Sequence, residues 1–166
     1  MRRPELGDVV GIPVGVRRLP ASDVDGSDLE GRPRTLSLAS AGHWTLLLFL
    51  GSRCDGCLPF WTLPPEPTAC GLGPQDAVVV VTRGPGAEEP GAIAALAGRH
   101  HVDVSGLVVM SDAAWRSYRV LGPPFFVLVG GMEVVTEGVA WSVEQVAADV
   151  ARARRARPGR QAAPRA

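Results

Sequence analysis

This 166-residue chain contains no lysine, and all 17 of its basic residues are arginines. With 20 Gly and 15 Pro, the bias is typical of a GC-rich genome, so the arginine content by itself indicates no arginine-specific chemistry. The three cysteines cannot form a disulfide framework, because any pairing leaves one over. No run approaches the roughly 18 apolar residues of a membrane span. We therefore expect one globular domain with an ordinary core and no membrane span.

Charge is distributed unevenly along the chain. Residues 151–166 contain six Arg and no acid, whereas residues 1–150 contain 11 Arg against 17 acidic residues, a balance of −6. A nucleic-acid-binding domain would carry its basic residues on folded structure, so we expect no nucleic-acid partner. Residues 154–166 are expected to be a disordered Arg-rich tail, with loose binding of an acidic partner or anionic lipid as the alternative.

The N-terminal residues 1–20 are expected to form an extension, with a possible strand at 9–17. Its first residues, MRRPELGDVVGIPVGV, make a poor signal peptide. Glu5 and Asp8 interrupt the apolar stretch that such a peptide requires, and Pro13 lies in the run that follows. A cytoplasmic location is therefore expected, unless an N-terminal anchor is missing from the chain.

Apolar runs and turn residues predict alternating strands and helices over residues 21–153. Residues 21–34 are rich in Asp, Ser and Gly and are expected to be loop, with a tight turn at Glu30-Gly31. A hairpin around Gly130-Gly131 is expected to follow the alternating part, and Ser142 is expected to cap the last helix with Gln145 as its capping-box partner. The expected strands are 35–38, 44–50, 77–82, 107–110, 125–129 and 132–139; the expected helices are 54–63, 88–100, 112–118 and 142–153. This order predicts an α/β fold, with a central mixed sheet flanked by helices.

Two cysteines two residues apart follow the most apolar of these runs, in LLLFLGSRCDGCLPFW, residues 46–61. A thiolate at Cys54 would lie at the start of a helix, where unpaired N–H groups and the helix dipole stabilise negative charge. The two-residue spacer lets Cys57 attack a mixed disulfide formed on Cys54. Arg53 is a favourable positive neighbour for that thiolate, and Asp55 opposes it.

The strand, the CDGC sequence and a later GPPFFVLVGG segment together resemble the thioredoxin-like superfamily. The lead-in DLEGRPRTLSL and the Phe60-Trp61 pair are similar to its TlpA-like and MauD-like branch of thiol–disulfide oxidoreductases. The resemblance implies a thioredoxin-like domain over residues 21–153, with an N-terminal β extension ahead of its core. It also implies that Pro124 is a cis-proline lying against the cysteine pair.

The resemblance further implies an activity and its site. The protein would exchange disulfides with a protein or small thiol substrate through catalytic Cys54 and Cys57. Arg53, Pro123 and Pro124 would face the substrate, and Pro124 would also keep metals off the dithiol. No cofactor and no metal are expected, and an unidentified electron donor would be a second partner.

The chain departs from the family pattern at three positions, which keep a second function open. Arg53 stands where thioredoxins usually have Trp, and Leu48 stands where they have a buried acid that accepts a proton. Pro123 has no N–H to offer a bound peptide. The alternative is a non-catalytic thioredoxin-fold module that binds a partner or metal, with vestigial cysteines.

Other chemistries for the cysteine pair lack supporting residues. Zinc would require two more ligands, for which Cys70, His100 and His101 are the plausible suppliers. A peroxiredoxin-like peroxidase would need a hydroxyl residue three positions before Cys54, where this chain has Gly51.

The third cysteine and the tryptophans have simpler explanations. Cys70 is expected to be either a resolving thiol or an incidental buried cysteine. The tryptophans are expected in core or edge packing; they are Trp44, Trp61, Trp115 and Trp141.

Overall fold

The structure is a computed structural model that describes residues 19–39, 43–63, 66–99 and 107–157. Within these residues, eight strands form one mixed sheet in the order β1-β8-β7-β4-β5-β6-β2-β3. The expected α/β class is therefore confirmed. The strands are β1 (Leu19–Pro20), β2 (Val24–Ser27), β3 (Pro33–Leu36), β4 (Trp44–Phe49), β5 (Ala77–Thr82), β6 (Val108–Met110), β7 (Phe125–Gly130) and β8 (Glu133–Val139).

Strand β4 lies in the middle of the sheet, because its apolar residues can be covered on both faces. It pairs in parallel with β5 and antiparallel with β7. Alternate side chains of β4 enter two separate core clusters: Leu46 and Leu48 belong to one, Leu47 and Phe49 to the other. All four are fully buried. The continuous apolar run thus predicted the central strand correctly.

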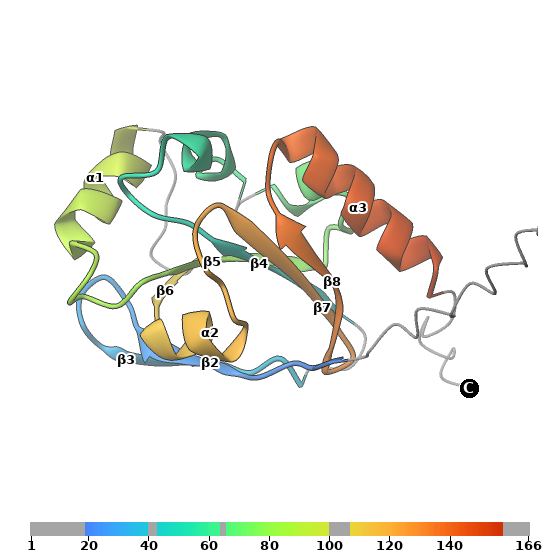
Figure 1. Cartoon of the computed structure of the whole chain (residues 1–166), viewed down its shortest axis with the longest axis horizontal. Helices are drawn as coiled ribbons and strands as arrows, with labels where there is room; N and C mark the ends of the chain where they lie inside the picture. The colour runs from blue at the N-terminus through green and yellow to red at the C-terminus, as the bar shows by residue number, and fades with distance from the viewer. Residues whose placement is uncertain (1–18, 40–42, 64–65, 100–106, 158–166) are drawn as a thin grey trace, which may run out of the picture.

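Helices cover both faces of this sheet. Helices α1 (Pro90–Arg99) and α3 (Val143–Arg155) lie on one face, and the short α2 (Asp112–Ser117) lies on the other (Figure 1). Two 3-10 helices, η1 (Asp55–Phe60) and η2 (Pro67–Cys70), follow β4 and add to the cluster under α1 and α3. The expected closing helix is present, and Ser142 Oγ accepts the N–H of Gln145 at 3.1 Å, as a helix cap should.

The β7–β8 hairpin is present, but its turn lies one residue later than expected. Gly130 still pairs with Glu133, so Gly131 and Met132 form a two-residue loop. Their φ angles are 59° and 67°, the pair of positive values that a type I′ turn requires. Met132 therefore occupies a left-handed conformation that favours glycine.

The expectation of loop over residues 21–34 is wrong in part, because β2 lies there. It forms a hairpin with β3, which begins two residues earlier than predicted. The expected turn between them is present: Gly31 has a φ of 80°, and Asp28 Oδ1 accepts the N–H groups of Glu30 and Arg32 at 3.0 and 2.9 Å. Arg32 Nε also donates to Asp28 Oδ2 at 2.7 Å.

The chain before β2 is attached to α2 by a tyrosine hydroxyl. The O–H of Tyr118 donates to the carbonyl of Ser22 at 2.5 Å and accepts the Ser22 N–H at 3.1 Å. With β1 paired to β8, these bonds place the described part of the N-terminal extension against the body of the sheet. The possible strand at 9–17 lies outside the described residues.

Helix α3 extends to Arg155, two residues beyond the expected end of the helix at 153. Arg154 Nη1 donates to the carbonyl of Gly71 at 2.7 Å, and Arg157 Nη2 bonds Glu133 at 2.7 Å. The expected domain boundary at 153 stays a prediction. Residues 158–166 of the expected tail lie outside the described residues. In the part of the chain that the structure describes, no helix is long and apolar enough to cross a membrane.

Candidate active site

The cysteine pair lies where the central strand ends. The N–H of Leu50 still donates to the carbonyl of Val81 at 3.2 Å, after which Gly51 to Arg53 form a turn. Cys54 then caps η1 in an extended conformation, and the N–H of Cys57 donates to its carbonyl at 3.0 Å. The apolar strand thus carries the chain to the sheet edge, and the turn directs both cysteines there.

Cys54 and Cys57 are joined in a disulfide, with their α-carbons 5.2 Å apart. Cys54 is half-buried, whereas Cys57 is fully buried. An attacking thiol or thiolate can therefore approach Cys54 and not Cys57. This asymmetry fits a dithiol in which Cys54 meets the substrate and Cys57 acts from behind.

The helix after Cys54 is shorter and tighter than expected. It is a six-residue 3-10 helix that ends at Phe60 and contains Pro59. Because Pro59 has no N–H, it removes a donor that a regular α-helix would use. Stabilisation of a Cys54 thiolate by a long helix dipole is therefore a smaller effect here than the sequence suggested.

The expected proline lies against the dithiol. The Pro123–Pro124 peptide bond is cis, as the resemblance implied. Pro124 Cδ lies 3.5 Å from the point where a Cβ of Gly56 would be, between the two cysteines. The carbonyl of Pro124 accepts the N–H of Ala140 at 3.0 Å, which attaches this segment to the end of β8.

The predicted site residues therefore come together. Pro123 is exposed, with its Cγ 3.6 Å from the Cβ position of Gly51. Arg53 is exposed in the turn beside Cys54. These two residues lie at the rim of the disulfide, with Pro124 behind them.

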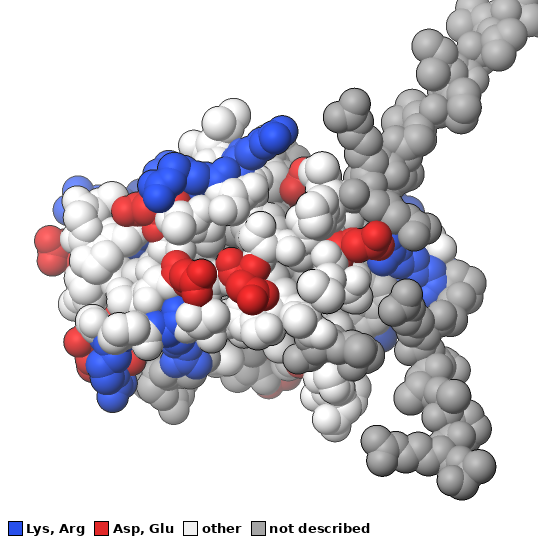
Figure 2. All heavy atoms as spheres, turned by 90° about the horizontal axis from the view of Figure 1, so that it is seen from below, with Lys and Arg blue, Asp and Glu red and all other residues white. Residues whose placement is uncertain are grey.

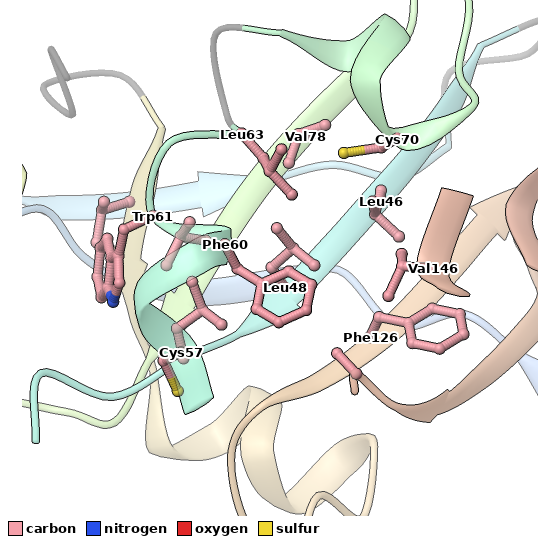
Figure 3. Packing of buried hydrophobic residues seen from close by; sticks show 14 of the residues in the cluster. Leu46, Leu48, Cys57, Phe60, Trp61, Leu63, Cys70, Val78, Phe126 and Val146 are labelled. Atoms are coloured by element: carbon pink, nitrogen blue, oxygen red, sulfur yellow. The ribbon is translucent and has the colours of Figure 1, made fainter. Parts of the chain in front are cut away.

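On its buried side the dithiol packs against hydrophobic residues of the described chain. Cys57, Phe60, Leu48 and Phe126 belong to one buried cluster (Figure 3). The structure thus places residue 48 on the face of β4 that Cys57 covers, as the comparison with thioredoxins implied. Because Leu48 carries no carboxyl group, it offers Cys57 no proton acceptor.

Sequence reasoning missed Glu88 and Ser52. Glu88 follows β5, and its Oε1 and Oε2 accept hydrogen bonds from the N–H and Oγ of Ser52 at 3.1 and 2.5 Å. The two residues are 36 positions apart, so no local spacing could reveal the contact. The available signal was that β4 and β5 are parallel neighbours, whose carboxyl ends meet at one edge of the sheet.

The rim also carries exposed apolar side chains. Leu58 follows Cys57 directly, and Leu121 precedes the Pro123-Pro124 pair. Trp141 follows Ala140, the residue that bonds Pro124, and is 80% exposed. The expectation of core or edge packing is therefore wrong for Trp141. It holds for Trp61 and Trp115, which are buried, and for Trp44, which packs against the core while half-buried.

Cys70 lies away from the dithiol. Figure 3 shows it at the far end of the cluster from Cys57, beside Leu46 and Val78. It is fully buried, and burial raises the pKa of its thiol to about 11. Both properties favour the incidental buried cysteine over a resolving thiol.

The described part of the chain contains no cluster of metal ligands. No group of three or more His, Cys, Asp and Glu side chains lies close enough together there to hold a metal ion. His100 and His101, considered above as ligands, lie outside the described residues. On the face that Figure 2 shows, basic and acidic side chains are interspersed among uncharged residues.

Comparison with known proteins identifies the fold. No protein-family model and no curated protein sequence matches the chain. Among solved structures, it is similar to a thioredoxin-family thiol:disulfide interchange protein of Chlorobium tepidum, with a TM-score of 0.62 and 17% identity over 86% of this chain and 98% of that one.

Two further structures resemble the chain to a similar extent. One is a secreted disulfide oxidoreductase of Mycobacterium tuberculosis homologous to E. coli DsbE, with a TM-score of 0.58 and 19% identity over 77% and 94% of the two chains. The other is yeast Sco1, with a TM-score of 0.59 and 16% identity over 84% and 97%. The thioredoxin-like fold expected from the sequence is therefore confirmed.

Proposed function

We propose that the protein is a thiol–disulfide oxidoreductase that works through Cys54 and Cys57. The observation that carries the proposal is the Cys54–Cys57 disulfide at the end of the central strand, with Cys54 half-buried and Cys57 fully buried. The solved structures named above as interchange protein and oxidoreductase support it, since they share this fold. We also propose that the protein belongs to the TlpA-like or MauD-like branch of the thioredoxin-like superfamily.

In the reducing direction, the Cys54 thiolate attacks one sulfur of a substrate disulfide. A Cys54–substrate bond forms, the substrate S–S bond breaks, and the departing thiolate takes a proton from water. The Cys57 thiolate then attacks Cys54 Sγ: the Cys54–Cys57 bond forms, the Cys54–substrate bond breaks, and the second substrate sulfur leaves as a thiolate that takes a proton from water. The substrate gains two electrons and the dithiol loses them; a separate dithiol donor must return them.

The substrate is a disulfide-bonded protein or the disulfide of a small thiol compound. Pro123 and Pro124 have no N–H, and the carbonyl of Pro124 already accepts the N–H of Ala140. A bound polypeptide therefore finds no N–H donor at residues 123 and 124. Exposed Leu121 and Trp141 supply apolar contact area beside them.

The buried side of the site favours one alternative function. Because Leu48 gives Cys57 no acid, and Arg53 and Pro123 depart from the family pattern, a binding module with vestigial cysteines is the second candidate. Such a module would use the same rim to hold a partner, without exchanging disulfides. Its cysteines would form no reversible couple.

A trapping experiment tests the proposed exchange. In a Cys70→Ala background, Cys57→Ser should accumulate a mixed disulfide between Cys54 and an added disulfide-bonded peptide, detected by mass. Cys54→Ser is the matched control and should trap nothing, because Cys57 is fully buried. Equal trapping by both variants, or by neither, contradicts the proposed roles.

The reduction potential separates the two candidate functions. The wild-type protein is equilibrated in glutathione or dithiothreitol buffers, and the Cys54–Cys57 disulfide is quantified by alkylation. A defined two-electron transition supports the oxidoreductase. A reduction potential of about −270 mV, as in thioredoxin, indicates a reductant. A potential of about −120 mV, as in DsbA, indicates an oxidant. A pair that stays reduced, or stays oxidised, at every buffer ratio supports the binding module.

The expected cytoplasmic location stays a prediction. Fractionation of cells that produce the protein would test it, with detection of the protein outside the cytoplasm as the contrary result.

A further inference from the structure

Glu88 joins two loops at the dithiol. It lies between β5 and α1 and is half-buried, and both of its carboxylate oxygens accept hydrogen bonds from Ser52. The distances are 3.1 Å to the Ser52 N–H and 2.5 Å to the Ser52 Oγ. Both contacts are donated to the carboxylate, as its ionised form requires. A side chain from a separate loop thus fixes the turn that leads into Cys54.

The same carboxylate lies close to Cys54 itself. A Cβ built on Gly51 would be 3.1 Å from Glu88 Oε1 and 3.7 Å from Cys54 Cβ. Pro123 Cγ lies 3.6 Å from the same point. Glu88, Cys54 and Pro123 therefore surround the Cβ position of residue 51, which is empty because this residue is glycine.

The loop that carries Glu88 is itself anchored. The N–H groups of Ala87 and Glu88 donate to the carbonyl of Gly84 at 2.9 and 3.0 Å. The N–H of Gly84 donates to Asp112 Oδ1 at 3.1 Å, at the first residue of α2. Hydrogen bonds thus extend from α2 through this loop to Ser52, which holds the carboxylate in place.

The other charges around Cys54 are exposed or have partners elsewhere. Arg53 and Asp55 flank it on its own loop, have opposite signs and are exposed, and Glu89 is exposed beside Glu88. Arg83 lies over the ring of Trp115, with its guanidinium carbon 4.5 Å from the ring centre.

The start of α2 and residues 121–124 add no competing charge at Cys54. Asp112, at the start of α2, is bound to Gly84, and residues 121–124 carry no titratable group. Glu88 is thus the carboxylate whose field reaches Cys54 with the least screening by water.

We propose that Glu88 is a positioning residue: its carboxylate holds the turn before Cys54 and, by its negative charge, disfavours the Cys54 thiolate and makes the disulfide harder to reduce. The inference rests on the proposed oxidoreductase function. A like charge disfavours a nearby thiolate, and a less stable thiolate stabilises the reduced form less. The disulfide form carries no charge on sulfur, so Glu88 affects the reduced form selectively.

The expected size follows from Coulomb's law. A unit charge about 7 Å away changes a thiol pKa by about half a unit in water-like surroundings, and by more than about one unit where the effective dielectric constant is about 20. Removal of the charge should therefore lower the Cys54 pKa by at least about half a unit. The reduction potential should become more positive.

The test compares Glu88→Gln with Glu89→Gln in a Cys70→Ala background. The amide introduced at position 88 can still accept the Ser52 N–H and donate to Ser52 Oγ, so the substitution removes charge while keeping both contacts. Glu89→Gln removes the same charge from an exposed neighbour on the same loop. The readouts are the pH dependence of iodoacetamide labelling of reduced Cys54 and the reduction potential.

Glu88→Gln should lower the Cys54 pKa by at least about half a unit and raise the potential, and Glu89→Gln should produce less than about half of either shift. An unchanged pKa in Glu88→Gln, or equal shifts in both variants, overturns the inference. A lower melting temperature with no change of pKa or potential shows a merely structural residue and also overturns it.

Two further results distinguish a failure of this inference from a folding defect of the variant and from a failure of the proposed function. If Glu88→Gln does not fold, Glu88→Asp replaces it, because Asp keeps the charge and both acceptors but withdraws them by one methylene. Its Cys54 pKa should then fall below that of the wild type, and an unchanged value overturns the inference. No redox transition in the wild type would refute the proposed function itself.

Discussion

Cys70 makes the stability of the protein fall at alkaline pH. The thiol is fully buried in the folded protein, and burial raises its pKa to about 11. In the unfolded chain the same thiol has a pKa of about 9. As the pH rises above about 9, the unfolded state loses its proton first, so the free energy of unfolding decreases until the pH passes about 11.

The size of this effect follows from the two pKa values. At pH 10, a thiol that ionises at about 9 when unfolded and at about 11 when folded lowers the free energy of unfolding by about 1.4 kcal/mol. That is a large fraction of the roughly 5–15 kcal/mol that stabilises a typical domain.

Because the chain has no lysine, no lysine side chain titrates in the pH range of this measurement. Apart from the α-amino group, few groups titrate between about pH 8.5 and 10 in this sequence. The Cys54–Cys57 disulfide does not titrate while it is oxidised. Tyr118 is the single tyrosine, and burial raises its pKa to about 12, so it contributes mainly above about pH 10.

Urea unfolding of the oxidised protein at pH 7.5 and pH 10 measures the effect, with Cys70→Ala as the control. The wild type should lose about 1.4 kcal/mol through this thiol between the two pH values. Cys70→Ala should be less stable at pH 7.5, because it leaves a small cavity, but should lose much less between the two. Equal losses in the two proteins would refute the reasoning from burial.

Two further substitutions test the attachment of the N-terminal segment and the docking of a substrate. Tyr118→Phe removes the hydroxyl that bonds Ser22, and because Ser22 is exposed and water can replace the partner, we expect a loss of about 1 kcal/mol in urea unfolding at pH 7. An unchanged midpoint would show that this hydroxyl contributes no net stability. Trp141→Ala should change stability by less than about 0.5 kcal/mol, since Trp141 is 80% exposed, yet slow exchange with a disulfide-bonded peptide several-fold while leaving exchange with oxidised glutathione unchanged. Equal slowing with both substrates would contradict a docking role for this side chain.

The sequence predicted those elements whose signal is local. Strands β4 and β5 are long continuous apolar runs, and the β7–β8 hairpin combines another such run, β7, with glycines at its turn. The dithiol was predictable because CDGC follows β4 directly. Its relation to Pro124 was expected only through the family resemblance.

The elements that were missed depend on contacts between distant residues. Strand β2 reads VDGS and carries no apolar run; its backbone pairs with β3 and approaches β6, where a Cβ on Gly26 would collide with the carbonyl of Met110. The bonds between Glu88 and Ser52 join loops 36 residues apart. Both features arise only when the sheet assembles.

The apolar character of β4 also determines how charge is arranged at the site. Leu48 is fully buried in the cluster that contains Cys57, so an acid at that position would replace core packing, a change that costs about 2–5 kcal/mol when a leucine is truncated. It would also bury a polar group without a partner in the described cluster. The chain instead has its carboxylate at the rim, on Glu88, where Ser52 satisfies both oxygens. In the proposed exchange, Cys57 would react from apolar surroundings, which disfavour a thiolate, while the proposed effect of Glu88 would fall on Cys54. Cys54 is half-buried and Cys57 fully buried, so in this proposal accessibility is the property that assigns the first attack to Cys54.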